Sequence, residues 1–397
     1  MASNSTYTRW GIIGSGEGGG RIVSQYLTGK DNDGVDDRVS ILNTNRSDLG
    51  NIFDSIDGFN EGSEVLKENG VVFSDQEGVG NFWPRGASCA QDDISKIAEG
   101  LTDMVASDAV IHVTAVGGGT GNGSTPYVIE QFKDGFDDAN DQANRFDRDI
   151  AQIAFGVWPF YDEFAQRQFN AICGLSRLLK TADGSQNADM VLLAANSHLG
   201  DAESDPEDHT EINQMITTAI ELMISAGRNA SPIIDVEDYI RIPSQLDAYH
   251  FAPAVATGVN GQIIQPEGFP DKALKNTFVP LDVETSSTVY MIVRAPENMV
   301  GENITETEIT STLQKWIKDK EIHTRNAQAT LSSKPERGTD VDVLLLFGGF
   351  DLDPLISYSR EEFEELSKSL PGGDQLSRKK MELIEDNLES YLSKNRN

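Results

Sequence analysis

The sequence has few cysteines and few basic residues, and both shortages restrict what the protein does. Cys89 and Cys173 are its only cysteines, too few for a disulfide framework or a cysteine-based zinc site. Lysine and arginine total 32 against 64 aspartates and glutamates, which gives a formal net charge of -32. Such a surface repels nucleic-acid phosphates and anionic lipids, so we expect neither as a general partner.

Long apolar runs are also missing. No stretch approaches the ~20 apolar residues that a membrane-spanning helix needs, and residues 1–9 lack the apolar core of a secretory signal. We therefore expect a cytoplasmic protein without direct membrane insertion. Because molar salt shortens the Debye length to ~3 Å, the acidic excess favours a salt-rich cytoplasm, such as that of a halophilic archaeon, over ordinary salt.

What is present predicts a two-domain α/β protein, since single cores seldom grow past ~250 to 300 residues. Apolar strands alternate with helices up to residue 195, which is typical of a doubly wound parallel sheet. We expect a nucleotide-binding domain over residues 1–205, a central core helix within 206–230 and a smaller α+β domain over 231–397. A last amphipathic helix is expected around Met381 to Leu392.

Two glycine-rich loops follow two of the expected strands, and a helix follows each loop. They read Gly14-Ser15-Gly16-Glu17-Gly18-Gly19-Gly20 and Gly117-Gly118-Gly119-Thr120-Gly121-Asn122-Gly123. Glycine lets backbone N–H groups at a helix N-terminus surround phosphate oxygens without a side chain in the way. Because both loops leave the same edge of a parallel sheet, they predict a phosphate site clasped from two sides.

The kind of nucleotide site is narrowed by what surrounds these loops. The G-x-G-x-x-G spacing of Gly14, Gly16 and Gly19 alone fits an NAD-dependent oxidoreductase. That fold places an acidic residue after the second strand, where Asn43-Thr44-Asn45 stands instead, so NAD is a distant alternative. The phosphate loop G-x-x-x-x-G-K-[ST] is absent from the sequence, which argues against Ras-like and ATPase-like sites.

The second loop resembles the G-G-G-T-G-x-G signature of the tubulin/FtsZ superfamily. The first loop, the Asn43-Thr44 turn, Pro159-Phe160 and a later acidic pair occur in the family's order. Residues 16–21 and 233–238 look closer to the archaeal CetZ branch than to bacterial FtsZ. The resemblance covers about residues 10–242 and implies the tubulin/FtsZ fold and a GTP-binding, self-assembling cytoskeletal GTPase.

Carried over residue by residue, the resemblance implies a GTP or GDP site without protein metal ligands. Mg²⁺ would be held through phosphates and water, and K⁺ is a second candidate. Thr44 and Asp48 would line the sugar side, Asn196 and Asn213 would read the guanine, and His209 would stack on it. The full implied set is Gly14, Ser15, Gly16, Glu17, Gly18, Gly19, Arg21, Asn43, Thr44, Gly117, Gly118, Gly119, Thr120, Gly121, Asn122, Gly123, Pro159, Glu163, Arg167, Asn196, His209 and Asn213.

Three features depart from the family or have a plainer explanation. Glu17 would repel phosphate unless a cation intervenes, or it faces solvent. The segment 78–86 holds the place of the loop that senses the γ-phosphate, but contains the unusual run Phe82-Trp83-Pro84-Arg85. Glu163 and Arg167 either contact nucleotide or form an ordinary helical ion pair.

Catalysis is expected from Asp235 and Asp238, whose D-x-x-D spacing matches the family's paired acids. In relatives this loop enters the nucleotide site of the next subunit, which implies head-to-tail homopolymers. The alternative is two exposed acids in an acidic protein. The expected role is cell shape or related cytoskeletal organisation. Other candidates are an FtsZ-like division protein, a plasmid or viral filament, and a non-hydrolysing regulator or scaffold of related tubulin-like proteins.

Overall fold

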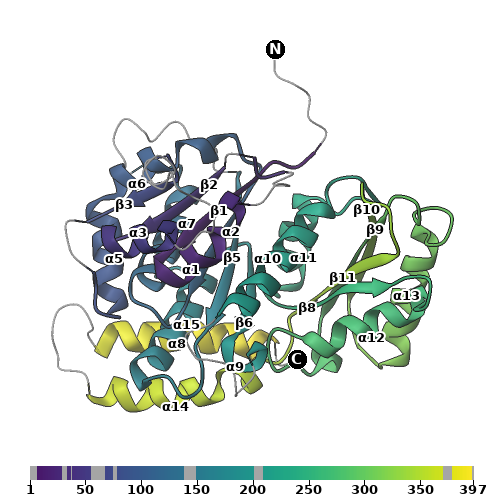
Figure 1. Cartoon of the computed structure of the whole chain (residues 1–397). Coiled ribbons are helices and arrows are strands. Elements are labelled where there is room, and N and C mark those ends of the chain that lie inside the picture. Colours follow the sequence, from purple (N-terminus) through teal and green to yellow (C-terminus); the bar gives the residue numbers. More distant parts are fainter. Residues whose placement is uncertain are drawn as a thin grey trace. The chain divides into compact units, whose positions relative to one another are not determined.

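The computed structural model describes residues 7–28, 34–36, 38–54, 68–74, 78–137, 149–200, 209–369 and 378–395 (Figure 1). The chain divides into two compact units. We call Arg9–Val191 with Ile356–Lys394 the glycine-loop unit, and Met1–Thr8 with Leu192–Leu355 and Asn395–Asn397 the mixed-sheet unit. The chain passes from the first to the second within β6 (Met190–Ala195).

The glycine-loop unit is built on parallel strands in the order β3-β2-β1-β4-β5. These are β1 (Trp10–Ser15), β2 (Val39–Asn43), β3 (Gly70–Val72), β4 (Ala109–Ala115) and β5 (Ala151–Trp158). Every residue of β1, β2 and β5 is buried, as expected for parallel strands that are covered on both faces. The sheet predicted from the alternating pattern is confirmed.

Helices cover both faces of this sheet (Figure 1). They are α1 (Gly16–Val23), α2 (Gln25–Thr28), α3 (Arg46–Asp54), α5 (Trp83–Asp92), α6 (Ile94–Gly100), α7 (Thr120–Lys133) and α8 (Ala165–Leu179). Adjacent strand residues point to opposite faces. On β2, Ile41 lies with Ile52 beside Gly20, hence beside α1 and α3, whereas Leu42 belongs to a core with Ile97 of α6 and α7 residues.

The C-terminal helices α14 (Asp353–Ser369) and α15 (Arg378–Asn395) pack against α8. The Trp158 indole N–H donates to Ser359 Oγ at 2.9 Å, and Ser359 donates to Gln168 Oε1 at 2.6 Å. Ser176 Oγ donates to the Ile384 carbonyl at 2.8 Å. The expected final helix is confirmed, and its apolar side chains from Met381 to Leu392 are buried.

The compact units differ from the expected division of the chain. Residues 231–397 were expected to form one domain, but contacts place Ile356–Lys394 with the glycine-loop unit. The expected boundary at residue 205 lies outside the described residues. A division into GTP-binding domain (1–205), central helix (206–230) and activation domain (231–397) stays a prediction.

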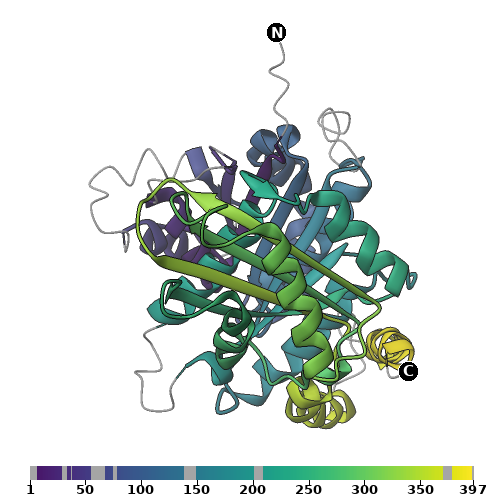
Figure 2. The same cartoon turned by 90° about the vertical axis from the view of Figure 1, so that its right-hand side faces the viewer.

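The mixed-sheet unit contains strands in the order β8-β11-β9-β10-β7. Strand β11 (Asp340–Gly348) runs antiparallel to β8 (His250–Asn260) and β9 (Thr288–Pro296), and β10 (Asn326–Lys334) is parallel to β9 and antiparallel to β7 (Ala230–Ser231). Its helices are α9 (Asn196–Leu199), α10 (Thr210–Ser225), α11 (Val236–Leu246), α12 (Phe269–Ala273) and α13 (Glu306–Asp319). Helix α13 lies across β10 (Figure 2) and begins with the expected Thr305/Glu308 capping box. This is the smaller α+β part that the sequence predicts.

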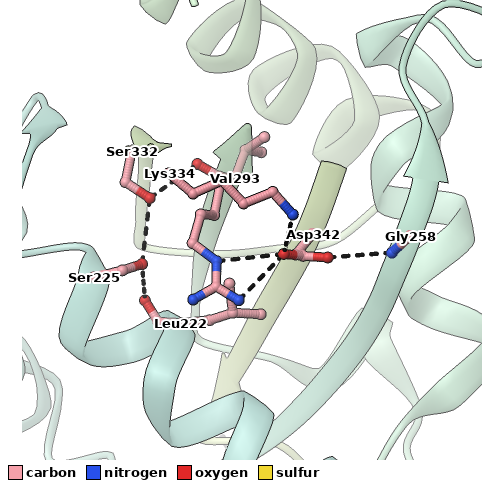
Figure 3. A network of polar contacts seen from close by, with 8 residues as sticks. Leu222, Ser225, Gly258, Val293, Ser332, Lys334 and Asp342 are labelled. Carbon is pink, nitrogen blue, oxygen red and sulfur yellow. Dashed lines mark hydrogen bonds and ion pairs between the residues drawn. The ribbon is translucent and has the colours of Figure 1, made fainter. Parts of the chain in front are cut away.

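One ionic cluster joins the strands of the mixed sheet (Figure 3). Asp342 of β11, 6% exposed, accepts from Arg294 Nη2 at 3.2 Å, Lys334 Nζ at 3.1 Å and the Gly258 N–H at 3.1 Å. Two cations around one buried carboxylate offset the loss of its hydration. The cluster therefore ties β8, β9, β10 and β11 together.

The central helix α10 is fixed to this sheet by a serine pair (Figure 3). Ser225 Oγ lies 3.2 Å from Ser332 Oγ of β10 and donates to the Leu222 carbonyl at 2.7 Å.

Among the residues that the structure describes, no helix is long and apolar enough to span a bilayer.

Candidate functional site

The two glycine loops contact each other at the ends of β1 and β4. Gly16, which follows β1, has a φ of +71°, a conformation that favours glycine. A Cβ atom added to Gly121 would lie 2.3 Å from the Ser15 carbonyl oxygen. The Thr44 and Thr120 hydroxyl oxygens are 2.9 Å apart. The structure thus brings the first loop, the end of β2 and the second loop together, as the sequence predicts for a parallel sheet edge.

Helix α8 holds the second glycine loop (residues 117–123) through side-chain amides. Asn170 Nδ2 donates to the carbonyls of Gly117 at 2.9 Å and Gly118 at 3.2 Å. Asn122 Nδ2 donates to the carbonyls of Val116 at 2.6 Å and Asn170 at 2.7 Å. The side-chain N–H groups of Asn122 are therefore bonded within the protein.

The 78–86 segment lies against this loop, and Asn170 of α8 bonds to both. Gly78, Gly80 and Asn81 all have positive φ angles, of 121°, 60° and 57°. The Asn81 carbonyl also lies 2.8 Å from Asn170 Nδ2, whose two N–H groups are thus shared among three carbonyls. A Cβ atom on Gly86 would lie 2.4 Å from the Gly119 carbonyl oxygen. The segment that the resemblance assigns to γ-phosphate sensing thus shares one side-chain amide with the second loop.

The charge of Glu17 beside the first loop is balanced by Arg21. Arg21 Nη2 and Nε donate to Glu17 Oε1 at 2.9 and 3.2 Å, and both side chains are substantially exposed. The pKa of Asp48 is raised above its ordinary value by burial and by the Glu17 charge, while Arg21 lowers it. The cation required beside Glu17 is therefore present in the chain itself.

The segment 159–167 lies at the other side of the second loop. Arg167 Nη1 is 2.5 Å from Glu163 Oε2, and Glu163 Oε1 accepts from the Phe160 N–H at 2.8 Å. A Cβ atom on Gly117 would lie 3.2 Å from Pro159 and 3.3 Å from Arg167. The ion pair that the i, i+4 spacing predicts is present, beside the loop.

Buried polar atoms around the two loops indicate that the place suits a phosphorylated ligand. Within the described part of the chain, Ser15 Oγ, Asn43 Nδ2 and Thr114 Oγ1 are buried and have no hydrogen-bond partner. Buried polar groups of native proteins are nearly always bonded. These neutral donors, with the loop amides, match the acceptor oxygens of a nucleotide's phosphates and sugar.

The residues predicted to read the base belong to the mixed-sheet unit. Asn196 begins α9, and His209 directly precedes α10. The Asn213 N–H donates to the His209 carbonyl at 2.9 Å. The predicted spacing of one helical turn between His209 and Asn213 is thus present, and all three residues are half-buried.

Asp235 and Asp238 form a reciprocal capping box at the start of α11. The Asp238 N–H donates to Asp235 Oδ1 at 3.3 Å, and the Asp235 N–H donates to Asp238 Oδ2 at 3.1 Å. Gln328 Nε2 donates to Asp238 Oδ1 at 3.1 Å. Asp235 is exposed and Asp238 half-buried. Both carboxylates are therefore oriented by hydrogen bonds, so each has a structural role whatever else it does.

Two residues that hold the second loop were not predicted from the sequence: Asn170 and Arg177, both on α8. Asn170 is fully buried between Phe169 and Ala171 in a helix whose buried side is mostly apolar. A buried amide at such a position is a signal that indicates a bonding role, because a buried amide needs partners.

Comparison with known proteins defines the class of protein to which this geometry belongs. Residues 10–202 match the Tubulin/FtsZ family, GTPase domain, so this part of the chain is a tubulin/FtsZ GTPase domain. The tubulin-like protein CetZ of Pyrococcus abyssi is 22% identical over 386 residues, 94% of either chain.

Solved structures agree on the fold. GDP-bound monomeric CetZ1 from Haloferax volcanii superposes with a TM-score of 0.70 at 20% identity, covering 90% of this chain and 99% of its own. The GTPγS-bound CetZ2 protofilament from the same organism gives 0.69 at 19% identity, covering 91% and 99%. The resemblance to the tubulin/FtsZ superfamily, and within it to CetZ proteins, is confirmed.

Proposed function

We propose that the protein binds GTP and GDP across the two glycine loops and hydrolyses GTP within a head-to-tail polymer of its own copies. The observation that carries this proposal is the contact between the loops, next to which Thr44, after β2, lies 2.9 Å from the Thr120 hydroxyl of the second loop. Buried donors without partners surround that contact. GDP-bound CetZ1 and the GTPγS-bound CetZ2 protofilament support both the ligand and the assembly.

In this proposal the backbone amides of residues 119–121, at the N-terminus of α7, bind the phosphates, because their N–H groups carry partial positive charge. The Gly118 N–H already donates to the Ala115 carbonyl at 3.2 Å. Thr44 and Glu163 contact the sugar. The role of Asn196, Asn213 and His209 in reading the base stays a prediction from the resemblance. A Mg²⁺ ion held through phosphate oxygens and water would neutralise phosphoryl charge, with K⁺ as a second candidate.

The acids that complete the reaction come from a second copy in this proposal. The capping box and Gln328 fix the carboxylates of Asp235 and Asp238. A fixed carboxylate near the γ-phosphate orients the attacking water without spending free energy on its own ordering. Turnover then depends on assembly, since the nucleotide site of one copy is completed only by the acids of another copy.

The test is GTP turnover as a function of protein concentration at high KCl. We expect turnover to rise more than linearly in the parent protein. Asp238→Asn, which keeps an acceptor for the capping box, and Asp238→Ala should bind GTP within about threefold of the parent, yet lose about 100-fold or more in turnover. Glu237→Gln is the matched control, because Glu237 lies on the same turn and pairs with Arg241. Parental turnover in both Asp238 variants would overturn the assignment.

A second candidate is a nucleotide-bound regulator or scaffold of related tubulin-like filaments that does not hydrolyse GTP. Glu17 and the run Phe82-Trp83-Pro84-Arg85 favour it, because the resemblance implies small residues in the segment 78–86. Turnover measured beside sedimentation separates the two, since a regulator binds GTP and joins filaments without releasing phosphate. For the hydrolysing polymer, the charge of -32 and the likeness to CetZ proteins support cell shape or related cytoskeletal organisation in the cytoplasm of a halophilic archaeon.

A further inference from the structure

Helix α7 contains a proline at a position where its backbone amide is needed. In an α-helix the N–H of residue i+4 donates to the carbonyl of residue i. Pro126 lies in the interior of α7, four residues after Asn122. Because proline has no N–H, the helix supplies no donor to the Asn122 carbonyl. An unbonded buried carbonyl is costly, so another group has to bond it.

Arg177 of α8 supplies that bond. Its Nη1 donates to the Asn122 carbonyl at 2.9 Å, and its Nη2 donates to the Gly123 carbonyl at 3.1 Å. The planar guanidinium suits two neighbouring acceptors, because its N–H groups form a rigid fork. Desolvation lowers the pKa of Arg177 to about 10, so the side chain stays cationic at neutral pH and its hydrogen bonds are charge-assisted.

Contacts with Trp83 and Asn187 hold Arg177 in place near Pro126. The guanidinium lies over the Trp83 ring, 4.3 Å from the ring centroid, and Trp83 begins α5, after the 78–82 segment. Asn187 Nδ2 donates to the backbone carbonyls of both Pro126 at 2.9 Å and Arg177 at 2.8 Å. Asn187 thus bonds the backbones of both Pro126, which lacks an N–H, and Arg177, which supplies the missing donor.

The bond to Asn122 reaches the phosphate-facing part of the loop through one rigid peptide. The Asn122 carbonyl and the Gly123 N–H belong to the same peptide plane. That N–H donates to the Gly119 carbonyl at 2.9 Å. The Gly119 carbonyl shares its peptide plane with the Thr120 N–H, which the proposed function assigns to phosphate. Fixing the Asn122 carbonyl therefore fixes the plane that closes the loop.

We propose that Arg177 is a positioning residue for nucleotide binding: its guanidinium replaces the amide that Pro126 lacks and so holds the second glycine loop in shape. This inference rests on the proposed function, because the loop is taken to bind phosphate. Arg177 itself touches no ligand in this account. It acts through the Asn122 and Gly123 carbonyls.

The experiment is a double-mutant cycle with Arg177→Met and Pro126→Ala in the full chain, read out as the dissociation constant for GDP. Arg177→Met alone should weaken GDP binding about 10-fold or more, the size expected for an unsatisfied buried carbonyl. Pro126→Ala alone should bind within about twofold of the parent. The double variant should return to within about threefold, because the alanine that replaces Pro126 restores the amide donor.

A second readout separates this role from general stability. Thermal unfolding without nucleotide should show the same coupling, because the carbonyl is unbonded only when both donors are missing. A purely structural Arg177 would lower the unfolding midpoint and leave GDP affinity unchanged, which would overturn the inference. Equal GDP affinity losses in Arg177→Met and in the double variant would also overturn it.

The outcomes keep this inference distinct from the proposed function. A parent protein that binds no GDP ends the proposed function and the nucleotide role of Arg177, whereas a parent that binds GDP with no coupling ends the inference alone. If Arg177→Met does not fold, Arg177→Lys replaces it in the cycle. A single ammonium cannot match both carbonyls, so the same rescue by Pro126→Ala is expected with a smaller loss.

Discussion

The two glycine loops meet at one place, but the structure holds them in different ways. The first loop (residues 14–20) is fixed by close backbone approach: a Cβ atom on Gly19 would lie 2.2 Å from the Val113 carbonyl oxygen. The second loop is fixed by donors from α8, namely Asn170 and Arg177. Close approach also holds the second loop, where a Cβ atom on Gly123 would lie 2.4 Å from the Trp83 carbonyl oxygen. The first loop thus depends on side chains that are absent, and the second depends in addition on particular side chains that are present.

This difference predicts how each loop responds to substitution. A change in a loop fixed by close approach fails by steric overlap, which is large and local. A change in a supporting side chain leaves the loop sequence intact and removes hydrogen bonds to its carbonyls. A substitution at the position where the loops touch should therefore cause steric overlap and also disturb the hydrogen-bonded second loop.

The largest effect is expected from Gly121→Ala, at the contact between the loops. Its Cβ atom would lie 2.3 Å from the Ser15 carbonyl and 2.5 Å from Thr114 Oγ1. We expect a loss of about 3 kcal/mol or more in the free energy of unfolding without nucleotide, and no measurable GDP binding. Denaturant unfolding and a GDP titration are the measurements.

Gly118→Ala is the matched control for that experiment. The nearest atom to a Cβ on Gly118 is the Ala115 carbonyl oxygen, at 3.5 Å, an ordinary contact. The nucleotide-free protein should therefore keep parental stability. Equal destabilisation by the two variants would show that the loops are not held by the contact described.

A somewhat smaller effect is expected from Asn170, which bonds the second loop and the 78–86 turn together. Asn170→Ala removes donors to three carbonyls, for an expected loss of about 2 to 4 kcal/mol in unfolding free energy. Asn170→Asp should be worse, because it turns a carboxylate toward carbonyl oxygens. Gln166→Ala is the control, since it removes only the 3.0 Å bond to Asn170 Oδ1. GDP affinity should fall more than tenfold in both Asn170 variants and stay parental in Gln166→Ala.

The same contrast explains what could be predicted from the sequence. The strands and glycine clusters are local patterns, so the parallel sheet and the meeting of the loops followed from them. Asn170 and Arg177 donate to carbonyls 53 and 55 residues away. A local pattern of apolar residues does not predict hydrogen bonds over such a separation in sequence. Asn122 was predicted from the loop signature to bind the nucleotide, and this stays a prediction. Its bonds to the Val116 and Asn170 carbonyls could not be predicted from the signature.

Tertiary contact also explains the helices whose place was not predicted. The apolar period of α15 predicts a helix with one buried side. It does not say what that side covers, and one of its partners is the buried hydroxyl of Ser176 on α8. The acidic pair is a further case, because the spacing of Asp235 and Asp238 fits a helix cap as well as it fits catalysis.

The smallest effect is expected at the exposed edge of the first loop, where charge rather than packing is involved. Glu17→Gln removes a negative charge beside the proposed phosphate site and leaves Arg21 without its carboxylate. GDP should bind about two- to threefold more tightly at low salt, and the gain should vanish in 1 M KCl because exposed charges are screened within ~3 Å there. The pKa of Asp48 should fall, since Glu17 is one of the charges that raise it. Arg21→Gln should shift both quantities in the opposite direction, measured by GDP titration and by NMR titration of the Asp48 carboxyl. A change in GDP affinity that does not depend on salt would mean instead that Glu17 acts on the conformation of the first loop and not through its charge.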